Sequence, residues 1–453
     1  MPEGHSHMPE GHSHMPRRRS PGKLRPLHLA AVIFLTVSGG PYGLESLFTY
    51  VGNHGALILL ILTPLFWDIP TILTVLELNS LMPITGGYYQ WVKHALGLRW
   101  AFFEGWWTWL YTFCDLAIYP VLFVGYISFF FPEIAAYKLP ICLFIIWSSA
   151  LLNIIGIVPV GRASVVLSVL VLVPFVFIFV LSFMHPAAPV PAPSLKGVGF
   201  SPFALGLYTV MWNYIGWDNA TTYAGEVSRP VRSYVTSIAI ALVLAVGIYV
   251  LSALAVARSG IDPAALASGQ FPALGVLVGG RWLGILVAAG GMASTFGLYS
   301  AVLLSVSRIP QVMADDQLLP SVLCTMHRRF ATPYVSIIAS SVIVSVLVIF
   351  TFSDLVVMDI ILYGAGLALE FIALIILRHK EPHRPRPFRI PLSRKALPFL
   401  FLAPIAIYVI ALCGAIGSSD KLSLPVLLGL AMLLSAAPAW WLIRWRKPHL
   451  HMP

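Results

Sequence analysis

Several acidic side chains fall within stretches of this sequence that are otherwise apolar enough to cross a membrane. They are Glu45, Asp68, Glu77, Glu104, Asp115, Asp218, Asp359 and Glu370. A charged residue at the centre of a bilayer costs about 2.5–3.5 kcal/mol on insertion scales, so it usually faces protein or a water-filled cavity. The same stretches contain almost no Lys or Arg. The sequence therefore predicts buried carboxylates that meet cations, such as protons, sodium ions or amines.

The first apolar segment is interrupted by residues that disfavour a helix. They are Ser38, Gly39, Gly40, Pro41, Tyr42 and Gly43. Each Gly costs a helix about 1 kcal/mol relative to Ala, and Pro41 lacks an N–H donor. Inside a membrane, freed backbone groups are tolerated only where protein or water satisfies them, as in the broken helices of transporters. We predict that Ser38, Gly39, Gly40, Tyr42 and Gly43 line a binding site, with Glu45 just behind them. A kinked helix with Gly used for packing is the alternative.

A second interruption lies in the apolar segment 201–225, where a polar island spans 212–222. The predicted site residues here are Asn213, Tyr214, Gly216, Trp217 and Asp218. Asp218 or Asn219 would cap a helix that restarts after the break. Breaks in the first and sixth spans are what an inverted repeat of five plus five spans produces.

Spans 3, 10 and 8 supply further candidates. Trp107, Tyr111, Asp115 and Tyr119 recur every four residues and share one slowly drifting helical face. Aromatic rings that flank a carboxylate bind alkylammonium groups at about 0.5–2 kcal/mol each, although such stripes more often serve packing. In span 10, Tyr363 is the lining candidate on a face shared with Gly366 and Glu370. In span 8, Ser294 and Thr295 either pack closely or ligate sodium.

The composition agrees with a membrane protein, because 58% of the residues are hydrophobic and 10% are charged. We predict an all-α integral membrane protein with about twelve transmembrane helices. The predicted spans are 27–50, 56–82, 99–131, 138–158, 161–184, 201–225, 233–258, 281–312, 333–352, 355–378, 396–418 and 422–445. A single transporter domain, 27–445, then holds helices 1–5 within 27–184, helices 6–10 within 201–378 and two extra C-terminal helices within 396–445. A disordered cytoplasmic tail, 1–26, precedes it, and a short cytoplasmic tail, 446–453, follows.

The basic residues predict the orientation. With both termini inside, the Lys and Arg residues that fall outside are Lys138, Lys196, Arg258, Arg281 and Lys421. Cytoplasmic loops of membrane proteins carry most of the Lys and Arg, so this distribution favours cytoplasmic termini in a multi-pass protein of the plasma membrane. The net charge of +10 is then a topology signal and does not indicate nucleic acid.

Other classes of protein lack their signatures here. The four cysteines are scattered, without metal-ligand or disulfide spacing. The histidines of the repeated segments 1–7 and 8–14 fit a disordered tail better than a metal site. No paired His motif of a membrane enzyme, no filter motif of a channel and no appended sensor domain is visible. We therefore predict no enzyme activity, no metal and no cofactor other than a coupling ion, while the oligomeric state stays open.

Several motifs resemble the amino acid/polyamine permeases of the APC superfamily, and among them the plant-type polyamine-uptake permeases. The segments are Ser38 to Glu45, Glu77-Leu78 with Pro83 and Thr85 to Val92, Glu104 to Trp107 with Asp115 and Tyr119-Pro120, Trp217-Asp218 with Ala224 to Glu226 and Pro230, Leu362 to Gly364 with Leu369 to Ala373, and Arg386 to Pro391. The resemblance covers roughly residues 27–400. It implies the broken-helix, inverted-repeat fold, a central site between spans 1, 3, 6, 8 and 10, and proton-coupled uptake.

Two departures from that family pattern stand out. Plant-type relatives carry extra acids in span 8, where this chain has uncharged residues at 297–302. Some other superfamily members use a span-5 lysine as the proton-linked cation, and no lysine follows Arg162 within this span. Both departures bear on substrate and coupling.

The acids at the two breaks favour one class of substrate. Amino-acid carriers usually offer the N-terminus of a half-helix to the substrate carboxylate. Here Glu45 and Asp218 already face those positive ends, unless they merely cap the helices and point away. We therefore predict a proton symporter that imports polyamines or other cationic amines by alternating access. The alternative is an amino-acid permease, for neutral or cationic amino acids, that works as a proton symporter or exchanger. The coupling candidates are Glu45, Asp115, Asp218, Ser294 and Thr295.

Overall fold

The computed structural model describes residues 23–184, 194–263, 266, 270–417 and 423–447. All its regular elements in these ranges are helices. They are α1 (Pro26–Val37), α2 (Glu45–Thr63), α3 (Ile69–Leu81), α4 (Gly87–Leu96), α5 (Leu98–Ser128), α6 (Lys138–Ile155), α7 (Ile157–Met184), α8 (Phe200–Trp212), α9 (Pro230–Ser259), α10 (Phe271–Gly279), α11 (Arg281–Val306), α12 (Arg308–Asp315), α13 (Tyr334–Leu347), α14 (Phe352–Lys380), α15 (Leu397–Leu400), α16 (Leu402–Gly417) and α17 (Leu424–Arg446). The predicted all-α class is confirmed.

The predicted spans can be followed in this helix order. Within the described residues, nine helices are long and apolar enough to cross a membrane. The remaining predicted spans are shorter, because α1 and α8 stop at the two breaks and α13 has 14 residues. Predicted spans 1 and 2 are separated at Gly52, whose φ of 66° and ψ of 178° turn the chain inside α2. A π-helical turn, Pro64–Asp68, then joins α2 to α3.

The segment after the second break differs from the prediction. No α-helix restarts at Asp218; two 3₁₀ turns, Asn219–Thr222 and Ala224–Glu226, lead instead to α9. The hydroxyl of Thr221 donates to the carbonyl of Asp218 at 2.6 Å, and that of Thr222 donates to the carbonyl of Asn219 at 2.9 Å. Such local side-chain bonds compete with the helical pattern, so the segment stays tightly turned.

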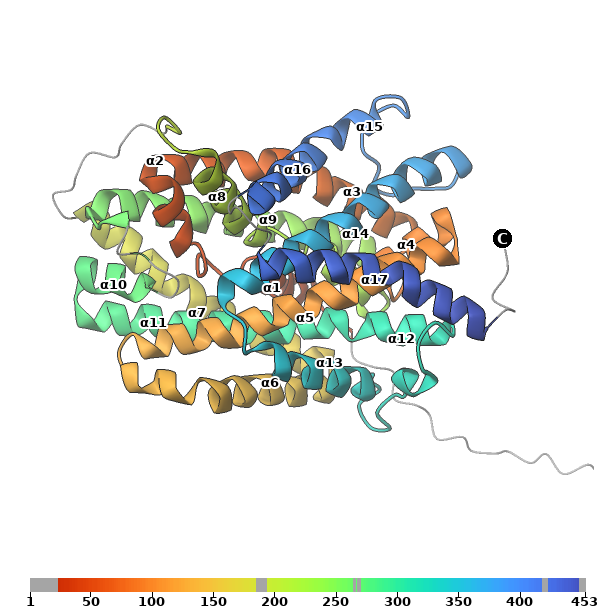
Figure 1. The fold of residues 1–453 in the computed structure, drawn as a ribbon, viewed down its shortest axis with the longest axis horizontal. Helices are drawn as coiled ribbons and strands as arrows, with labels where there is room; N and C mark the ends of the chain where they lie inside the picture. The colour runs from red at the N-terminus through yellow and green to blue at the C-terminus, as the bar shows by residue number, and fades with distance from the viewer. Residues whose placement is uncertain (1–22, 185–193, 264–265, 267–269, 418–422, 448–453) are drawn as a thin grey trace, which may run out of the picture.

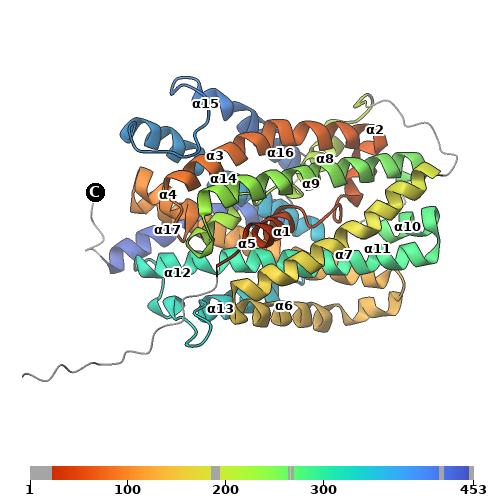
Figure 2. The same ribbon diagram turned by 180° about the vertical axis from the view of Figure 1, so that it is seen from behind.

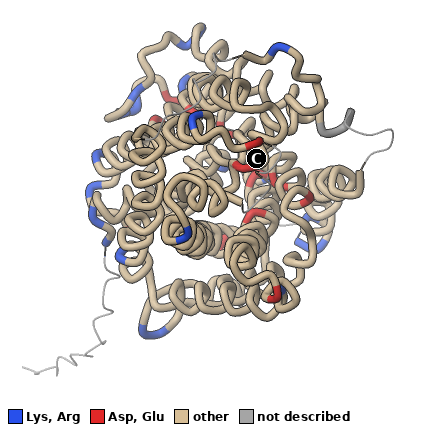
Figure 3. Tube along the Cα trace, turned by 90° about the vertical axis from the view of Figure 1, so that its left-hand side faces the viewer, with Lys and Arg blue, Asp and Glu red and all other residues tan. Residues whose placement is uncertain are grey.

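The helices surround the two breaks. Figures 1 and 2 show the long helices running broadly along one axis, with α1 in the interior of the bundle. Helix α5 packs against α14 and α11, while α1 packs against α7 and α9. Viewed along the bundle in Figure 3, acidic residues gather inside the ring of helices and many basic residues lie on its outside. This arrangement places membrane acids from several helices close to the breaks.

The packed chain begins before the boundary predicted for the disordered tail. Leu24 is buried and forms a parallel bridge with Val227. Its N–H donates to the carbonyl of Glu226 at 3.1 Å. The rest of the predicted tail, 1–22, lies outside the described residues, as do 448–453 of the C-terminal tail.

Candidate functional site

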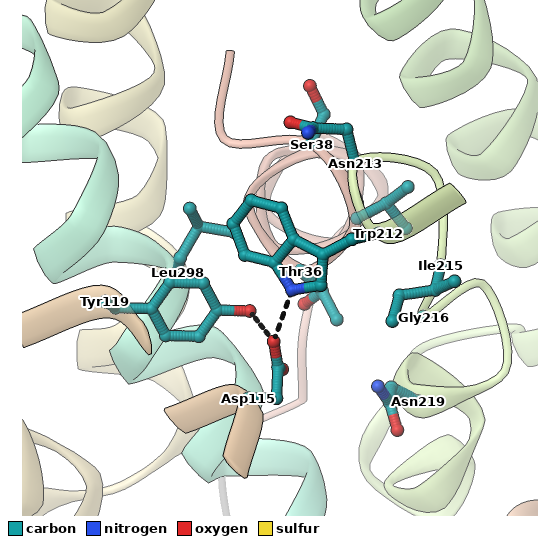
Figure 4. A pocket seen from close by; sticks show the side chains of 11 residues that line it. Thr36, Ser38, Asp115, Tyr119, Trp212, Asn213, Ile215, Gly216, Asn219 and Leu298 are labelled. Atoms are coloured by element: carbon teal, nitrogen blue, oxygen red, sulfur yellow. Dashed lines mark hydrogen bonds between the residues drawn. The ribbon is translucent and has the colours of Figure 1, made fainter. Parts of the chain in front are cut away.

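A small cavity lies where the two breaks meet. Its lining comes from the end of α1, from α5, from the break after α8 and from α11. The lining residues are Thr36, Val37, Ser38, Asp115, Tyr119, Trp212, Asn213, Ile215, Gly216, Asn219 and Leu298 (Figure 4). The space open to the centre of a water molecule is about 10 Å³, which is room for roughly one water. The cavity is therefore closed around little more than water in this state.

Asp115 is the carboxylate that faces this cavity. Its Oδ1 accepts hydrogen bonds from the hydroxyl of Tyr119 at 2.7 Å and from Nε1 of Trp212 at 3.3 Å (Figure 4). Asp359 of α14 lies near Asp115. Both carboxylate oxygens of Asp359 are buried without a hydrogen-bond partner. The two acids are therefore neighbouring buried carboxyl groups whose charged forms a cation would stabilise.

Ser38 and Gly39 hold the break in span 1 against α11. Gly39 has a φ of 57°, and a Cβ there would lie 2.5 Å from Cδ1 of Leu298. The hydroxyl of Ser294 donates to the carbonyl of Gly39. Thr295 instead donates to the carbonyl of Gly291 in its own helix. Of the two predicted span-8 residues, Ser294 contacts the break and Thr295 does not.

Glu45 and Tyr42 lie outside the cavity lining. The Glu45 carboxylate accepts hydrogen bonds from the N–H of Gly43 at 2.7 Å and from the hydroxyl of Tyr126 at 2.9 Å. Tyr42 donates to the carbonyl of Val287 at 2.8 Å. The bond to Gly43 lies within the break ahead of α2, and no side chain caps the N-terminus of that helix. Glu45 therefore points away from the cavity without capping α2. The predicted site residues Gly39, Gly40 and Gly43 also lie outside the lining.

The residues of the break after α8 point in two directions. Asn213 and Gly216 line the cavity, and Oδ1 of Asn213 is buried without a partner. Gly216 has a φ of 98°, and a Cβ there would approach the carbonyl oxygen of Thr36 at 3.3 Å. Tyr214 and Trp217 point away, because Tyr214 donates to a carbonyl of α2 and Trp217 donates to the carboxylate of Asp68 at 2.9 Å. Those two predicted site residues are not brought to the cavity.

A second group of acids lies beside the same break. The Tyr363 hydroxyl donates to Oδ1 of Asp218 at 3.1 Å and accepts from the N–H of Gly216 at 3.3 Å. Glu370 shares a hydrogen bond with Asp218 and lies near Glu104. Side chains of all three acids are buried. Asp218 thus belongs to an acidic cluster next to the cavity and is not part of its lining.

Trp107 does not share the predicted aromatic face. Its Nε1 donates to the carbonyl of Leu433 in α17 at 2.8 Å. A step of four residues turns a helix by about 40° beyond a full turn, so Trp107 and Tyr119 differ by roughly 120°. Tyr111 remains on the inner face, where its hydroxyl donates to Oδ1 of Asn219 at 2.9 Å.

Glu77 is a membrane acid that finds its cations within the protein. Its carboxylate binds the guanidinium of Arg378 and lies 3.4 Å from Nε of Arg386. Arg378 is the last residue of predicted span 10, and Arg386 comes from the following loop. The sequence does not show that these distant segments meet, so this ion pair could not be inferred from spacing.

Some functional candidates were missing from the prediction. The cavity-lining residues that sequence reasoning did not place in the site are Thr36, Val37, Trp212, Ile215, Asn219 and Leu298. Glu104, Asp359 and Glu370 were recognised as membrane acids but not assigned to a site. In a membrane span, the sequence does not distinguish an apolar residue that lines a cavity from one that does not. The regular spacing of the acids, by contrast, could have been used to assign them to a site.

Comparisons with known proteins agree with this architecture. Residues 27–434 match the model of the amino acid permease family. The chain belongs to that family. It is 35% identical over 382 residues to the polyamine transporter RMV1 of Arabidopsis thaliana, covering 82% of this chain and 76% of that protein. It is 32% identical over 421 residues to the polyamine transporter PUT1 of Oryza sativa subsp. japonica, covering 91% and 77%.

A bacterial relative is more distant. The serine/threonine exchanger SteT of Bacillus subtilis (strain 168) is 23% identical over 396 residues, covering 83% of this chain and 85% of that protein. Together with the apolar helices, these similarities make the permease a multi-pass membrane transporter and not an enzyme. The family resemblance found in the sequence motifs is confirmed.

Proposed function

We propose that this permease imports polyamines or related cationic amines by proton symport and alternating access. The observation that carries the proposal is the position of Asp115, which faces the cavity between the two breaks with Asp359 behind it. Two buried carboxylates favour a bound cation and disfavour a substrate carboxylate. The similarity to plant polyamine transporters supports the same class of substrate.

The aromatic residues around Asp115 suit an alkylammonium group. Tyr119 and Trp212 both donate to its Oδ1, and the centroids of their rings lie 6.2 Å apart. An ammonium beside the carboxylate would also contact these ring faces through cation–π attraction. Ser38 and Gly216 supply the backbone of the two breaks on other walls of the cavity. An ammonium at this point meets charge, aromatic faces and backbone carbonyls.

Proton coupling is supported by the acids, and sodium coupling is not. The sodium alternative needed Ser294 and Thr295 as ligands. Ser294 is already hydrogen-bonded to the carbonyl of Gly39, and Thr295 to its own helix. Buried carboxylates such as Asp115 and Asp218 bind and release protons as their surroundings change. The proposed coupling groups are therefore these two acids.

Alternating access is supported by the closed state of the cavity. A space of about 10 Å³ is far smaller than any polyamine. Broken helices absorb the movements that open such sites to one side of a membrane and then to the other. The break in span 1 is held by a few contacts, such as that of Ser294 with Gly39. We expect these contacts to change as the site opens.

The proposed location is the plasma membrane, with both termini cytoplasmic. Leu24 pairs with Val227, and the neighbouring Glu226 binds Arg308 at the start of α12. At the other end of the chain, Lys447 donates to the carbonyl of Gln317, just after α12. Both described ends therefore meet the same group of loops, which supports termini on one side of the membrane. The basic residues of these loops favour the cytoplasmic side.

Transport assays test the proposal directly. The purified protein would be placed in proteoliposomes with an imposed inward proton gradient, and uptake of radiolabelled putrescine, spermidine, arginine and leucine would be measured. We expect gradient-stimulated polyamine uptake that leucine does not compete. Uptake of leucine or arginine alone would overturn the polyamine assignment.

An amino-acid permease is the second candidate. It is favoured by the similarity to the serine/threonine exchanger and by Asn213, whose buried Oδ1 lacks a partner in the cavity. That amide would accept a hydrogen bond from an α-ammonium group. Exchange of preloaded amino acid for external amino acid, without a proton gradient, would identify this function.

A further inference from the structure

Helices α5 and α14 carry matching series of side chains. On α5 the series is Glu104, Thr108, Tyr111 and Asp115. On α14 it is Glu370, Gly366, Tyr363 and Asp359. In both helices the two acids are eleven residues apart (115 − 104 and 370 − 359), with an aromatic residue four positions from one acid. Positions i, i+4, i+7 and i+11 stay on one face of a helix.

The two series meet along the contact between the helices. Asp115 lies near Asp359 at one end, and Glu104 lies near Glu370 at the other. The rings of Tyr111 and Tyr363 pack edge to face between them, with centroids 5.4 Å apart. We name this contact the α5–α14 seam.

The interior of the seam is narrow near its second acidic end. A Cβ on Gly366 would lie 3.1 Å from Oε1 of Glu104. The glycine therefore leaves room for the Glu104 carboxylate against α14. Tyr111 packs against Tyr363 and Glu104 lies against Gly366, so the order on α14 is the reverse of that on α5 and the two helices run antiparallel here.

Buried oxygens without partners mark both ends of the seam as binding positions. Both carboxylate oxygens of Asp359 lack a hydrogen-bond partner, as does Oε2 of Glu104. Glu370 shares a hydrogen bond with Asp218, which is itself an acid. The side chains of Asp359, Glu104 and Glu370 are at most 1% exposed. Buried polar groups are normally satisfied, and no ion pair in the described part of the chain reaches these acids. A ligand that brings donors and positive charge to both ends would satisfy them.

The separation of the ends limits the length of such a ligand. Eleven residues of α-helix advance about 16 Å at 1.5 Å per residue. An extended chain advances roughly 1.2 Å per bond, so the terminal nitrogens are about 6 Å apart in putrescine, about 11 Å in spermidine and about 16 Å in spermine. An ammonium lies about 3 Å from the carboxylate it binds. Terminal nitrogens between about 10 and 16 Å apart therefore fit both ends.

We propose that the α5–α14 seam is an extended track for triamines and tetraamines, with one terminal ammonium at Asp115 and Asp359 and the other at Glu104 and Glu370. This inference rests on the proposed polyamine function and adds a selection for length. The Tyr111 and Tyr363 rings separate the two ends in this structure. They part to flank the methylene chain and its inner ammonium, which aromatic faces attract.

Binding of amines of different length tests the track. Competition of unlabelled putrescine, spermidine and spermine against labelled spermidine would be measured on the purified protein in detergent. In the wild type we expect spermidine and spermine to bind at least about tenfold more tightly than putrescine, which reaches one end only. Glu370→Gln should lower that ratio to about twofold or less, and Glu104→Gln, as a second variant, should lower it likewise.

A matched control comes from the outer face of the same helix. Trp107 hydrogen-bonds to α17 and lies away from the seam, so Trp107→Phe should keep the wild-type ratio. Equal affinity for putrescine and spermidine in the wild type, or an unchanged ratio in both glutamate variants, would overturn the track while polyamine transport stands. Failure of every polyamine to bind or be taken up would overturn the proposed function together with the track.

Discussion

Glu77 and Asp115 are buried acids of the same membrane domain with opposite surroundings. Glu77 binds Arg378, lies beside Arg386 and accepts from the N–H of Ile390 at 2.9 Å. Asp115 meets neutral donors and lies near a second acid, Asp359. Both are almost fully buried, with 0% and 4% of their surface exposed. Burial alone therefore does not separate a structural acid from a binding one, whereas the partner does.

The comparison has a physical basis. Removing a charge from water is costly unless another charge and further hydrogen bonds replace the lost hydration. Glu77 has these replacements within the protein, so its role is complete without a ligand. Asp115 and the cluster of Asp218, Glu104 and Glu370 lack a cation among the described residues. Their missing partner is supplied by protons or by a substrate.

The largest expected effect comes from breaking the structural pair. Arg378→Met would leave Glu77 buried without its main partner and should destabilise the protein by about 3–5 kcal/mol. Thermal unfolding in detergent would measure it. The double variant with Glu77→Gln should recover most of the loss, because no uncompensated charge remains. An unchanged unfolding temperature in Arg378→Met would contradict the structural role.

Neutralising Asp115 should have the opposite effects, with ligand binding lost and stability kept. Asp115→Asn removes repulsion with Asp359, so the unfolding temperature should stay the same or rise. Loss of a charged contact with a buried ammonium costs about 2 kcal/mol or more, so spermidine affinity should fall at least about 30-fold. Thermal unfolding and binding would be measured on the same sample. Wild-type affinity in this variant would remove Asp115 from the site.

Substitution of a glycine at the first break tests how tightly the backbone there is packed against α11. Gly39→Ala places a Cβ 2.5 Å from Leu298 at a φ of 57°, so we expect a loss of about 2 kcal/mol or more in stability, with reduced uptake. Gly247→Ala in α9 is the matched control, because nothing lies within 4 Å of its Cβ. That control should be neutral or slightly stabilising. Similar behaviour of the two variants would argue against strain at the break.

A smaller effect is expected at Trp107, which was predicted to line the site but packs against α17 in the structure. Trp107→Phe loses the hydrogen bond to the carbonyl of Leu433 and should lower stability by about 1 kcal/mol. Initial rates of polyamine uptake, normalised to the amount of protein, should match the wild type. A marked rise in the KM for spermidine would return Trp107 to the binding site.

The smallest effect is expected at a partly exposed acid in the loop after α14. Hydrogen bonds from Arg384 and from His94 hold the pKa of Glu381 below its usual value of 4.5. A lowered pKa stabilises the folded state above the usual value, and that contribution is lost as the pH falls through the folded pKa. Water screens this partly exposed group. The unfolding temperatures of the wild type and Glu381→Gln should therefore differ slightly at pH 7 and converge below about pH 4.

The sequence by itself determined the class of fold, the two breaks and the family. Hydrophobic runs of membrane length and helix-breaking residues act locally. The breaks could therefore be predicted from Gly39, Gly40 and Gly216 without knowing which residues pack against them. The acidic residues of the membrane segments were visible for the same reason. The restarting α-helix after Gly216 was a wrong prediction, because hydrogen bonds from Thr221 and Thr222 to nearby carbonyls favoured 3₁₀ turns.

Only the tertiary structure decided which acids keep a cation of their own and which face a ligand. Arg378 meets Glu77 across 301 positions of sequence, and Glu45 turns to Tyr126 and not to the cavity. Such distant pairings arise from helix packing, which a single sequence does not record. The rotation of each helix likewise sent Trp107 outward and brought Asp115 inward. Side-chain type was thus set by the sequence, whereas partnership was set by the fold.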